Sequence, residues 1–227
     1  MGAVPQPVAF AVDAEHRVTG ILLAPASARA GYVLAHGAGA GMRQKFLEAT
    51  ALGLAERGIA TFRYNFPYME AGGKRVDPPP LCHATVRAAV AEAARFLPKL
   101  PLVAGGKSFG GRMTSQTQAL EPLAGVRGLA FLGYPLHPPG KPSVDRAEHL
   151  SDVNVPMLFV QGTNDEFAEL ALLKTMVMKL GKRATLRLFE HADHSFHVPA
   201  KSGRKDAEVM GELLDALTDW TDEISAA

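Results

Sequence analysis

The stretch LVAGGKSFGGR, residues 102–112, decides the fold. Its first three residues are apolar and strand-like, and a helical pattern begins near Gly111. Between them lie residues 106–110 (GKSFG), which have the form G-x-S-x-G. Their glycines leave room for a helix to start directly against a strand, and so tight a turn holds its central serine at strained backbone angles. Ser108 is therefore the predicted nucleophile.

The rest of the chain alternates short apolar runs with longer stretches of helical periodicity. We predict strands at residues 7–12, 18–23, 33–35, 59–64, 102–104, 126–134, 157–161 and 184–189, and helices including 46–57, 81–97 and 205–221. The first two strands are expected to pair as an antiparallel hairpin at one sheet edge. Alternation of this kind predicts the α/β class, with a mostly parallel central sheet and helices on both faces. We expect a single domain over residues 1–227.

Composition excludes several other classes. The 24 basic residues nearly cancel 23 acidic ones, so the chain lacks the charge pattern of a nucleic-acid-binding protein. No stretch approaches the ~20 apolar residues of a membrane span. The single cysteine, Cys82, fits a reducing compartment, and we expect a cytoplasmic protein with a small-molecule substrate. We expect a monomer or homodimer without metal or cofactor.

Two nucleotide-binding motifs resemble parts of the chain and fail at one position each. A phosphate-binding loop that ends in residues 106–108 (GKS) would need glycine at position 101, which is Pro101. A dinucleotide fingerprint that starts at Gly37 would need glycine at position 42, which is Met42. The sequence therefore predicts neither a phosphate-binding loop nor a dinucleotide-binding site.

A glycine-rich loop, residues 36–41 (HGAGAG), follows the predicted strand 33–35. An acyl-transfer enzyme needs backbone N–H groups that face the developing oxyanion, and glycines allow the close approach that this requires. The amides of Ala38 and Phe109 are the predicted oxyanion-hole donors.

A serine nucleophile also needs a carboxylate and a histidine, in the chain order serine, acid, histidine. The turn after strand 157–161 offers Asp165, with Glu166 as the neighbouring alternative. Asp165 could instead be the N-cap of a following helix. The loop after the final strand offers His191, His194 and His197. His194 is the predicted general base because it lies just beyond the strand, while His191 is expected at the strand end.

Substrate contacts are harder to assign from sequence. Position along the chain makes His36, Gly39, Lys107 and His137 candidates. The Pro- and Gly-rich loops 69–80 and 135–142 are candidate rims of a pocket, with ordinary connections as the alternative. Six basic residues on nearby segments could attract an anionic substrate group, although a solvated surface is favoured: Arg43, Lys45, Lys74, Arg75, Lys107 and Lys141.

Taken together, the motifs HGAGAG, GKSFGG, GTNDEF and HADHSF resemble the α/β-hydrolase superfamily, in the family's order and over nearly the whole chain. The chain looks most like the compact branch without a lid, near the dienelactone hydrolases. The runs LAHGAGAGM, GKSFGGRM and GYPLHPPGKP are also similar to the hydrolase-like domain of a chromatin-complex subunit and its testis-expressed relatives.

This resemblance implies a serine hydrolase with a triad of Ser108, His194 and Asp165. The segment between Tyr134 and Pro156 is too short for a helical lid, which favours a small soluble carboxylic ester, thioester or lactone over aggregated lipid. Dienelactone hydrolases use a cysteine where this chain has Ser108, so their substrate is not carried over. The alternative is a weakly active or inactive hydrolase-fold interaction module.

Overall fold

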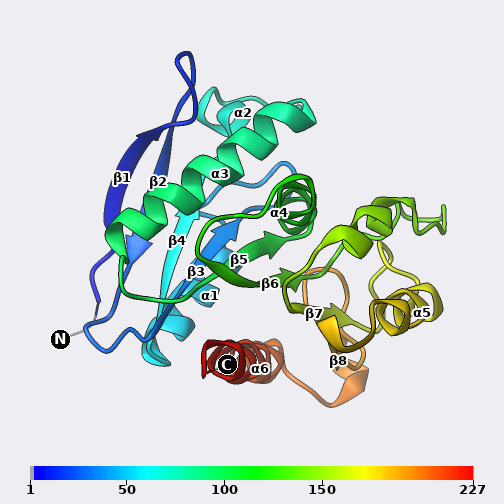
Figure 1. The fold of residues 1–227 in the computed structure, drawn as a ribbon. Coiled ribbons are helices and arrows are strands. Elements are labelled where there is room, and N and C mark those ends of the chain that lie inside the picture. Colours follow the sequence, from blue (N-terminus) through cyan, green and yellow to red (C-terminus); the bar gives the residue numbers. More distant parts are fainter. Residues whose placement is uncertain (1–2, 227) are drawn as a thin grey trace.

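The computed structural model describes residues 3–226. Their strands form one eight-stranded sheet with helices around it (Figure 1). The strand order is β1-β2-β4-β3-β5-β6-β7-β8. β1 pairs antiparallel with β2, and β2 with β4, whereas all other pairs are parallel. The predicted hairpin and mostly parallel sheet are thus confirmed. The strands are β1 (Gln6–Ala11), β2 (Arg17–Leu23), β3 (Ala30–Ala35), β4 (Ile59–Tyr64), β5 (Leu102–Lys107), β6 (Val126–Leu132), β7 (Met157–Gly162) and β8 (Ala184–Phe189).

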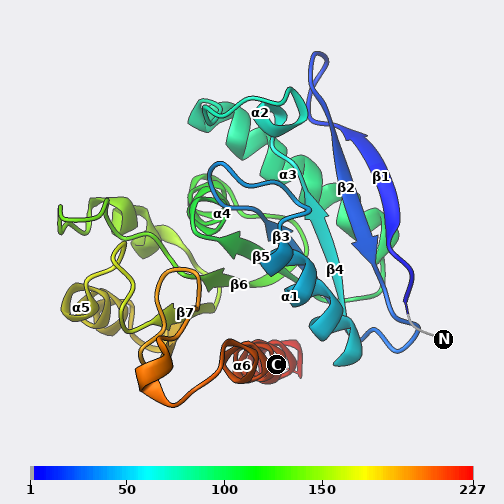
Figure 2. The same cartoon turned by 180° about the vertical axis from the view of Figure 1, so that it is seen from behind.

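Helices cover both faces of the sheet, with α3 and α4 on one side and α1 and α6 on the other (Figures 1 and 2). No helix within residues 3–226 combines the length and the apolar character needed to cross a bilayer. The helices are α1 (Lys45–Glu56), α2 (Pro67–Glu70), α3 (Pro79–Phe96), α4 (Phe109–Leu120), α5 (Leu170–Leu180) and α6 (Asp206–Ala226), with short 3-10 helices η1 (Asp145–Asp152), η2 (Gly181–Arg183) and η3 (Ala200–Ser202).

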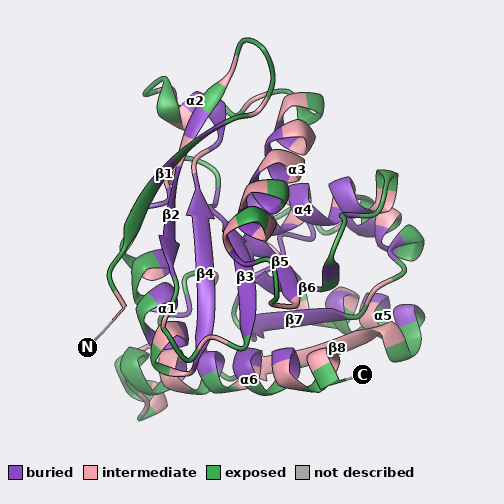
Figure 3. Cartoon of the chain, turned by 60° about the vertical axis from the view of Figure 1, so that its left-hand side comes forward, coloured by how far each residue is buried: buried purple, intermediate pink, exposed green. Residues whose placement is uncertain are grey.

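Every residue of the central strand β3 is buried, because helices cover both faces of the sheet (Figure 3). Successive side chains of a strand point to opposite faces. Tyr32 and Leu34 enter the core beneath α1 and α6, whereas Val33 and Ala35 enter the core beneath α3 and α4. A near-continuous apolar run is what a parallel strand buried on both faces requires.

The connection from β6 to β7 contains only loops and η1, so the described part of the chain shows no lid domain. β6 ends at Leu132, two residues before the predicted end at Tyr134. Gly133 adopts a positive φ of 71°, and the Tyr134 amide leaves the ladder to donate to the Gln161 side chain at 2.8 Å. This early end turns the chain across the carboxyl ends of the strands.

Candidate active site

The three predicted residues meet at the carboxyl edge of the sheet. Ser108 follows β5, Asp165 follows β7 and His194 follows β8. Ser108 Oγ lies 2.9 Å from His194 Nε2, and His194 Nδ1 lies 2.7 Å from Asp165 Oδ2. An unprotonated Nε2 can accept the serine hydroxyl proton while Nδ1–H donates to the carboxylate. The geometry is that of a nucleophile, base and acid, and their catalytic roles stay a prediction.

The turn that presents Ser108 is strained and tightly packed. Ser108 has φ 51° and ψ −118°, a region that side-chain-bearing residues seldom occupy. Its backbone amide donates to the Leu132 carbonyl at 3.2 Å, which ties the turn to β6. A Cβ atom at Gly110 would lie 2.5 Å from the His36 carbonyl oxygen. Glycine is therefore required where α4 starts against β3, as the motif predicts.

Asp165 is held by more than the histidine. Its side chain is fully buried, its Oδ1 accepts the Phe167 amide at 2.8 Å, and its Oδ2 accepts Gln161 Nε2 at 2.5 Å. The neighbouring Glu166 is exposed. Because α5 begins only at Leu170, Asp165 is not the cap of that helix. Of the two candidate acids, Asp165 is the one that contacts His194.

The loop that carries His194 is fixed by aromatic packing. The Phe167 ring lies 4.4 Å from the His194 ring, centroid to centroid. Phe196, which has a positive φ of 64°, stacks on Phe46 at 5.6 Å. His197 turns away and pairs with Asp206 at 2.9 Å. β8 ends at Phe189, as predicted, so His191, which was expected at the strand end, lies in the turn beyond it. Among the three histidines of this loop, His194 alone contacts Ser108.

Lys107 lies behind the histidine loop. Its Nζ donates to the His194 carbonyl oxygen at 2.6 Å and sits 5.8 Å from the centre of the Phe196 ring. The side chain is nearly fully buried, and this burial lowers its pKa to about 8. The expected substrate contact is therefore not what this geometry favours, since Lys107 supports the loop that carries His194.

His36 and His137 use both ring nitrogens within the protein. In His36, Nδ1 donates to the Gly37 carbonyl at 2.8 Å and Nε2 accepts the Phe66 amide at 3.1 Å. His137 makes the same pair of contacts, to the Pro138 carbonyl at 2.9 Å and the Glu169 amide at 2.8 Å. Burial lowers the pKa of His36 to about 4, which keeps its ring neutral. Both histidines thus fix loops around the site.

A cavity of about 270 Å³ opens onto Ser108. Both predicted oxyanion donors, Ala38 and Phe109, line it, and Phe109, as the first residue of α4, has no carbonyl four residues earlier in its helix. The Gly39 amide instead donates to the Tyr68 hydroxyl at 3.2 Å. The cavity is lined by Ala38, Val76, Ser108, Phe109, Arg112, Pro135, Arg146 and Phe167. Val76 and Pro135 come from the two Pro- and Gly-rich loops, which confirms those loops as its rims.

Four residues of the site were not predicted: Gln161, Phe167, Arg112 and Arg146. Two of them carried a signal in the sequence. Gln161 is a polar residue inside the apolar run of β7, and Arg112 lies one helical turn after Ser108, on the same side of α4. Phe167 and Arg146 lie in irregular segments, where periodicity gives no direction to a side chain.

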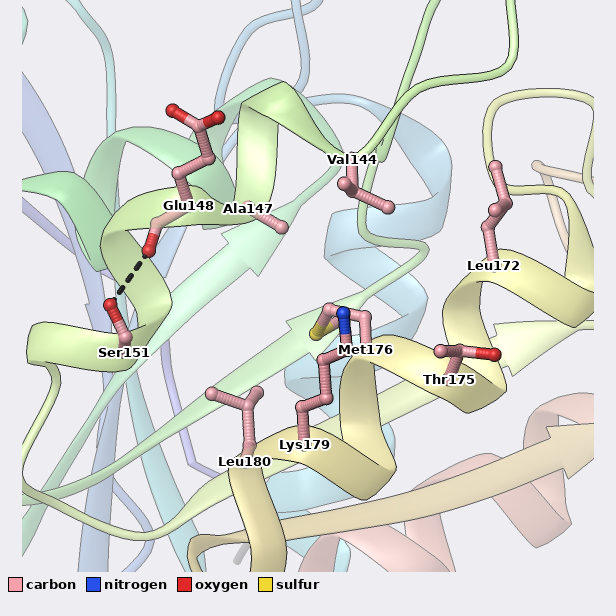
Figure 4. Close-up of a pocket in the computed structure, with 9 residues that line it drawn as sticks. All are labelled: Val144, Ala147, Glu148, Ser151, Leu172, Thr175, Met176, Lys179 and Leu180. Carbon is pink, nitrogen blue, oxygen red and sulfur yellow. Dashed lines mark hydrogen bonds between the residues drawn. The ribbon is translucent and has the colours of Figure 1, made fainter.

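A separate cavity of about 310 Å³ lies between η1 and α5 (Figure 4). Its lining is mostly apolar, and the Ser151 hydroxyl donates to the Glu148 carbonyl at 2.9 Å at its edge. It contains none of the three residues at the sheet edge. Within residues 3–226, no three His, Cys, Asp or Glu side chains are arranged to hold a metal ion.

Comparison with known proteins identifies the family of the chain and related folds. Residues 28–222 match a family described as an alpha/beta hydrolase domain. The chain is similar to a dienelactone hydrolase from Anabaena variabilis, with a TM-score of 0.77, 18% identity and coverage of 98% of this chain and 99% of that one. A serine hydrolase without a lid from Xanthomonas campestris gives a TM-score of 0.74, 19% identity and 97% and 96% coverage. A serine hydrolase homologue from Coxiella burnetii gives a TM-score of 0.75 and 20% identity, with coverage of 96% of this chain and 98% of that one.

Proposed function

We propose that this chain, which belongs to the alpha/beta hydrolase domain family, is a serine hydrolase that cleaves small carboxylic esters, thioesters or lactones through an acyl-enzyme. The observation that carries this proposal is the continuous hydrogen-bond path from Ser108 through His194 to Asp165, at 2.9 Å and 2.7 Å. Such a path activates a serine hydroxyl, which is otherwise a weak nucleophile at neutral pH.

In the acylation step, Ser108 Oγ attacks the scissile carbonyl carbon as its proton passes to His194 Nε2. The Ala38 and Phe109 amides stabilise the negative charge that develops on the carbonyl oxygen. When the tetrahedral intermediate collapses, the bond to the leaving group breaks and His194 returns the proton to the departing oxygen or sulfur. Buried Asp165 holds the imidazole in the required tautomer and stabilises the imidazolium.

In the deacylation step, water replaces the departed group. His194 Nε2 takes a proton from that water, which attacks the acyl carbon. Collapse of the second tetrahedral intermediate breaks the bond to Ser108 Oγ and releases the acid, while His194 gives the proton back to the serine. The cavity of about 270 Å³ suits a small acyl group rather than a long lipid chain.

Hydrolysis of a panel of para-nitrophenyl esters, thioesters and lactones tests the proposal. Replacement of Ser108 by Ala should lower kcat by at least about a thousandfold, because the nucleophile is lost. The matched control is Ser27→Ala, at an exposed serine outside the cavity, which should keep the wild-type rate. A folded wild-type protein that turns over no member of the panel, or a Ser108→Ala variant that keeps its rate, would contradict the proposal.

We also propose that the protein acts in the cytoplasm on a dissolved substrate. Its one cysteine, Cys82, is buried and free, and burial raises the pKa of its thiol to about 12. A thiol of that kind is unreactive and packs as a small apolar group. Fractionation of cells that express the tagged chain checks the compartment.

A further inference from the structure

Two arginine side chains line the Ser108 cavity. Arg112 comes from α4, and its backbone amide donates to the Ser108 carbonyl at 3.2 Å. Arg146 comes from η1, where the Tyr134 hydroxyl donates to its backbone carbonyl at 2.8 Å. Both side chains are only partly exposed. The backbones that present these two guanidinium groups are thus tied to the framework of the site.

Neither guanidinium has an anionic partner in the described part of the chain. Other arginines do pair, such as Arg57 with Asp215 at 2.7 Å, whereas no ion pair and no side-chain hydrogen bond joins Arg112 or Arg146 to residues 3–226. Arg112 Nε is also buried without a hydrogen-bond partner. Arg63 Nε is also buried without a partner, but of the two only Arg112 lines the Ser108 cavity. A buried donor left unsatisfied is costly, so a ligand oxygen beside Arg112 would remove that cost.

The two positive charges also act on each other. Burial is the main cause of a lowered pKa at Arg112, and the charge of Arg146 lowers it further. The Arg112 guanidinium carbon lies 5.9 Å from the centre of the Phe109 ring, a distance at which the ring face attracts a cation. Phe109 therefore helps to hold the guanidinium beside the nucleophile, where an anion would offset both charges.

We propose that the substrate carries an anionic group, a carboxylate or a phosphate, which Arg112 and Arg146 bind while Ser108 attacks the scissile carbonyl. This inference rests on the proposed hydrolase function and names its substrate class. A guanidinium presents a planar fork of donors that matches the oxygens of either group. The six basic residues noted from the sequence do not line this cavity, so the selectivity comes from these two arginines.

A pair of esters of matched length tests the substrate class. The wild type should hydrolyse the para-nitrophenyl monoester of glutarate with a kcat/KM at least about tenfold above that of para-nitrophenyl pentanoate. Arg112→Gln and Arg146→Gln should each remove most of this preference, measured as the ratio of the two kcat/KM values within the same variant. Arg112→Lys should restore part of it, because the charge remains while the fork is lost. Arg127→Gln, at an exposed arginine at the start of β6, is the control and should behave as the wild type.

Equal rates on the two esters, with no change in the Arg112 and Arg146 variants, would overturn the inference and leave the hydrolase proposal intact. Binding tests the anion site apart from turnover. Calorimetry on the Ser108→Ala protein should show binding of glutarate or of inorganic phosphate, and the ligand that binds more tightly identifies the anionic group. A second substitution in the Ser108→Ala protein separates the two arginines. Arg112→Gln should weaken the binding at least about tenfold, whereas Arg127→Gln should leave it unchanged. Absence of binding by both anions would also overturn the inference.

Discussion

The side-chain nitrogen of Gln161 donates a 2.5 Å hydrogen bond to Asp165 Oδ2, the same oxygen that accepts from His194 Nδ1. The Tyr134 amide donates to Gln161 Oε1 at 2.8 Å and so fixes which end of the side-chain amide faces the carboxylate. Gln161 is fully buried and lies on β7, an interior strand paired on both sides. We infer that it is a positioning residue for the acid.

Replacement of Gln161 by Leu should therefore lower kcat by about tenfold or more while KM changes little, because the carboxylate loses a partner but the cavity keeps its lining. Steady-state kinetics on a neutral ester measures this split, with urea unfolding as a check on stability. A rise in KM at constant kcat would instead mean that Gln161 acts on substrate binding.

Lys107 should make stability depend on alkaline pH. Burial lowers its pKa from 10.5 to about 8, so the unfolded chain binds the proton more tightly than the folded protein. Stability should therefore rise as pH increases from about 8 to 10.5, by about 3 kcal/mol. Urea unfolding of the wild type and of Lys107→Met across this range gives the difference in their free energies of unfolding at each pH. The contributions of the other titrating groups cancel in this difference. A difference that is constant with pH would show that the ammonium is not desolvated.

His36 should make stability depend on acidic pH. Its pKa is lowered by burial from 6.5 to about 4, so its contribution is complete above pH 6.5 and is lost as pH falls through about 4. His36→Gln should be less stable at neutral pH but should lose less stability on acidification. Unfolding curves for both proteins between these pH values test this, and parallel curves would exclude His36 as a source of acid sensitivity.

Gly110 should tolerate no side chain. Gly110→Ala places a methyl group against the His36 carbonyl, so we expect a loss of at least about 2 kcal/mol in the free energy of unfolding. Gly211→Ala is the matched control, since a Cβ there meets no atom within 4 Å and the position lies inside α6. The control should be more stable by up to about 1 kcal/mol. Thermal unfolding of both variants checks the contrast.

The sequence was most informative where periodicity and chain order constrain position. The strands could be predicted because each is a short apolar run, and Ser108, Asp165 and His194 because the carboxyl ends of parallel strands meet at one edge. Errors fell at element ends. β6 stops at Leu132, where a positive φ at Gly133 and a side-chain acceptor on Gln161 compete with the ladder.

Side-chain direction was the part that sequence could not supply. Lys107 adjoins the nucleophile, but the alternation of β5 turns it behind the sheet edge, toward the His194 carbonyl. His36 and His137 lie at the correct edge, yet the ring of each is occupied by the carbonyl of the next residue and by a backbone amide from a distant segment. Arg146 reaches the cavity through the path of an irregular loop, which no local pattern encodes.

An activated serine at position 108 is the central claim, and chemical labelling tests it most directly. The intact mass of the wild-type protein should increase by one adduct after treatment with a fluorophosphonate, which reacts with a serine hydroxyl made nucleophilic by an adjacent base. The Ser108→Ala protein should gain none, and Ser27→Ala should label as the wild type does. An adduct that survives in Ser108→Ala, or no adduct on folded wild-type protein, would contradict the account.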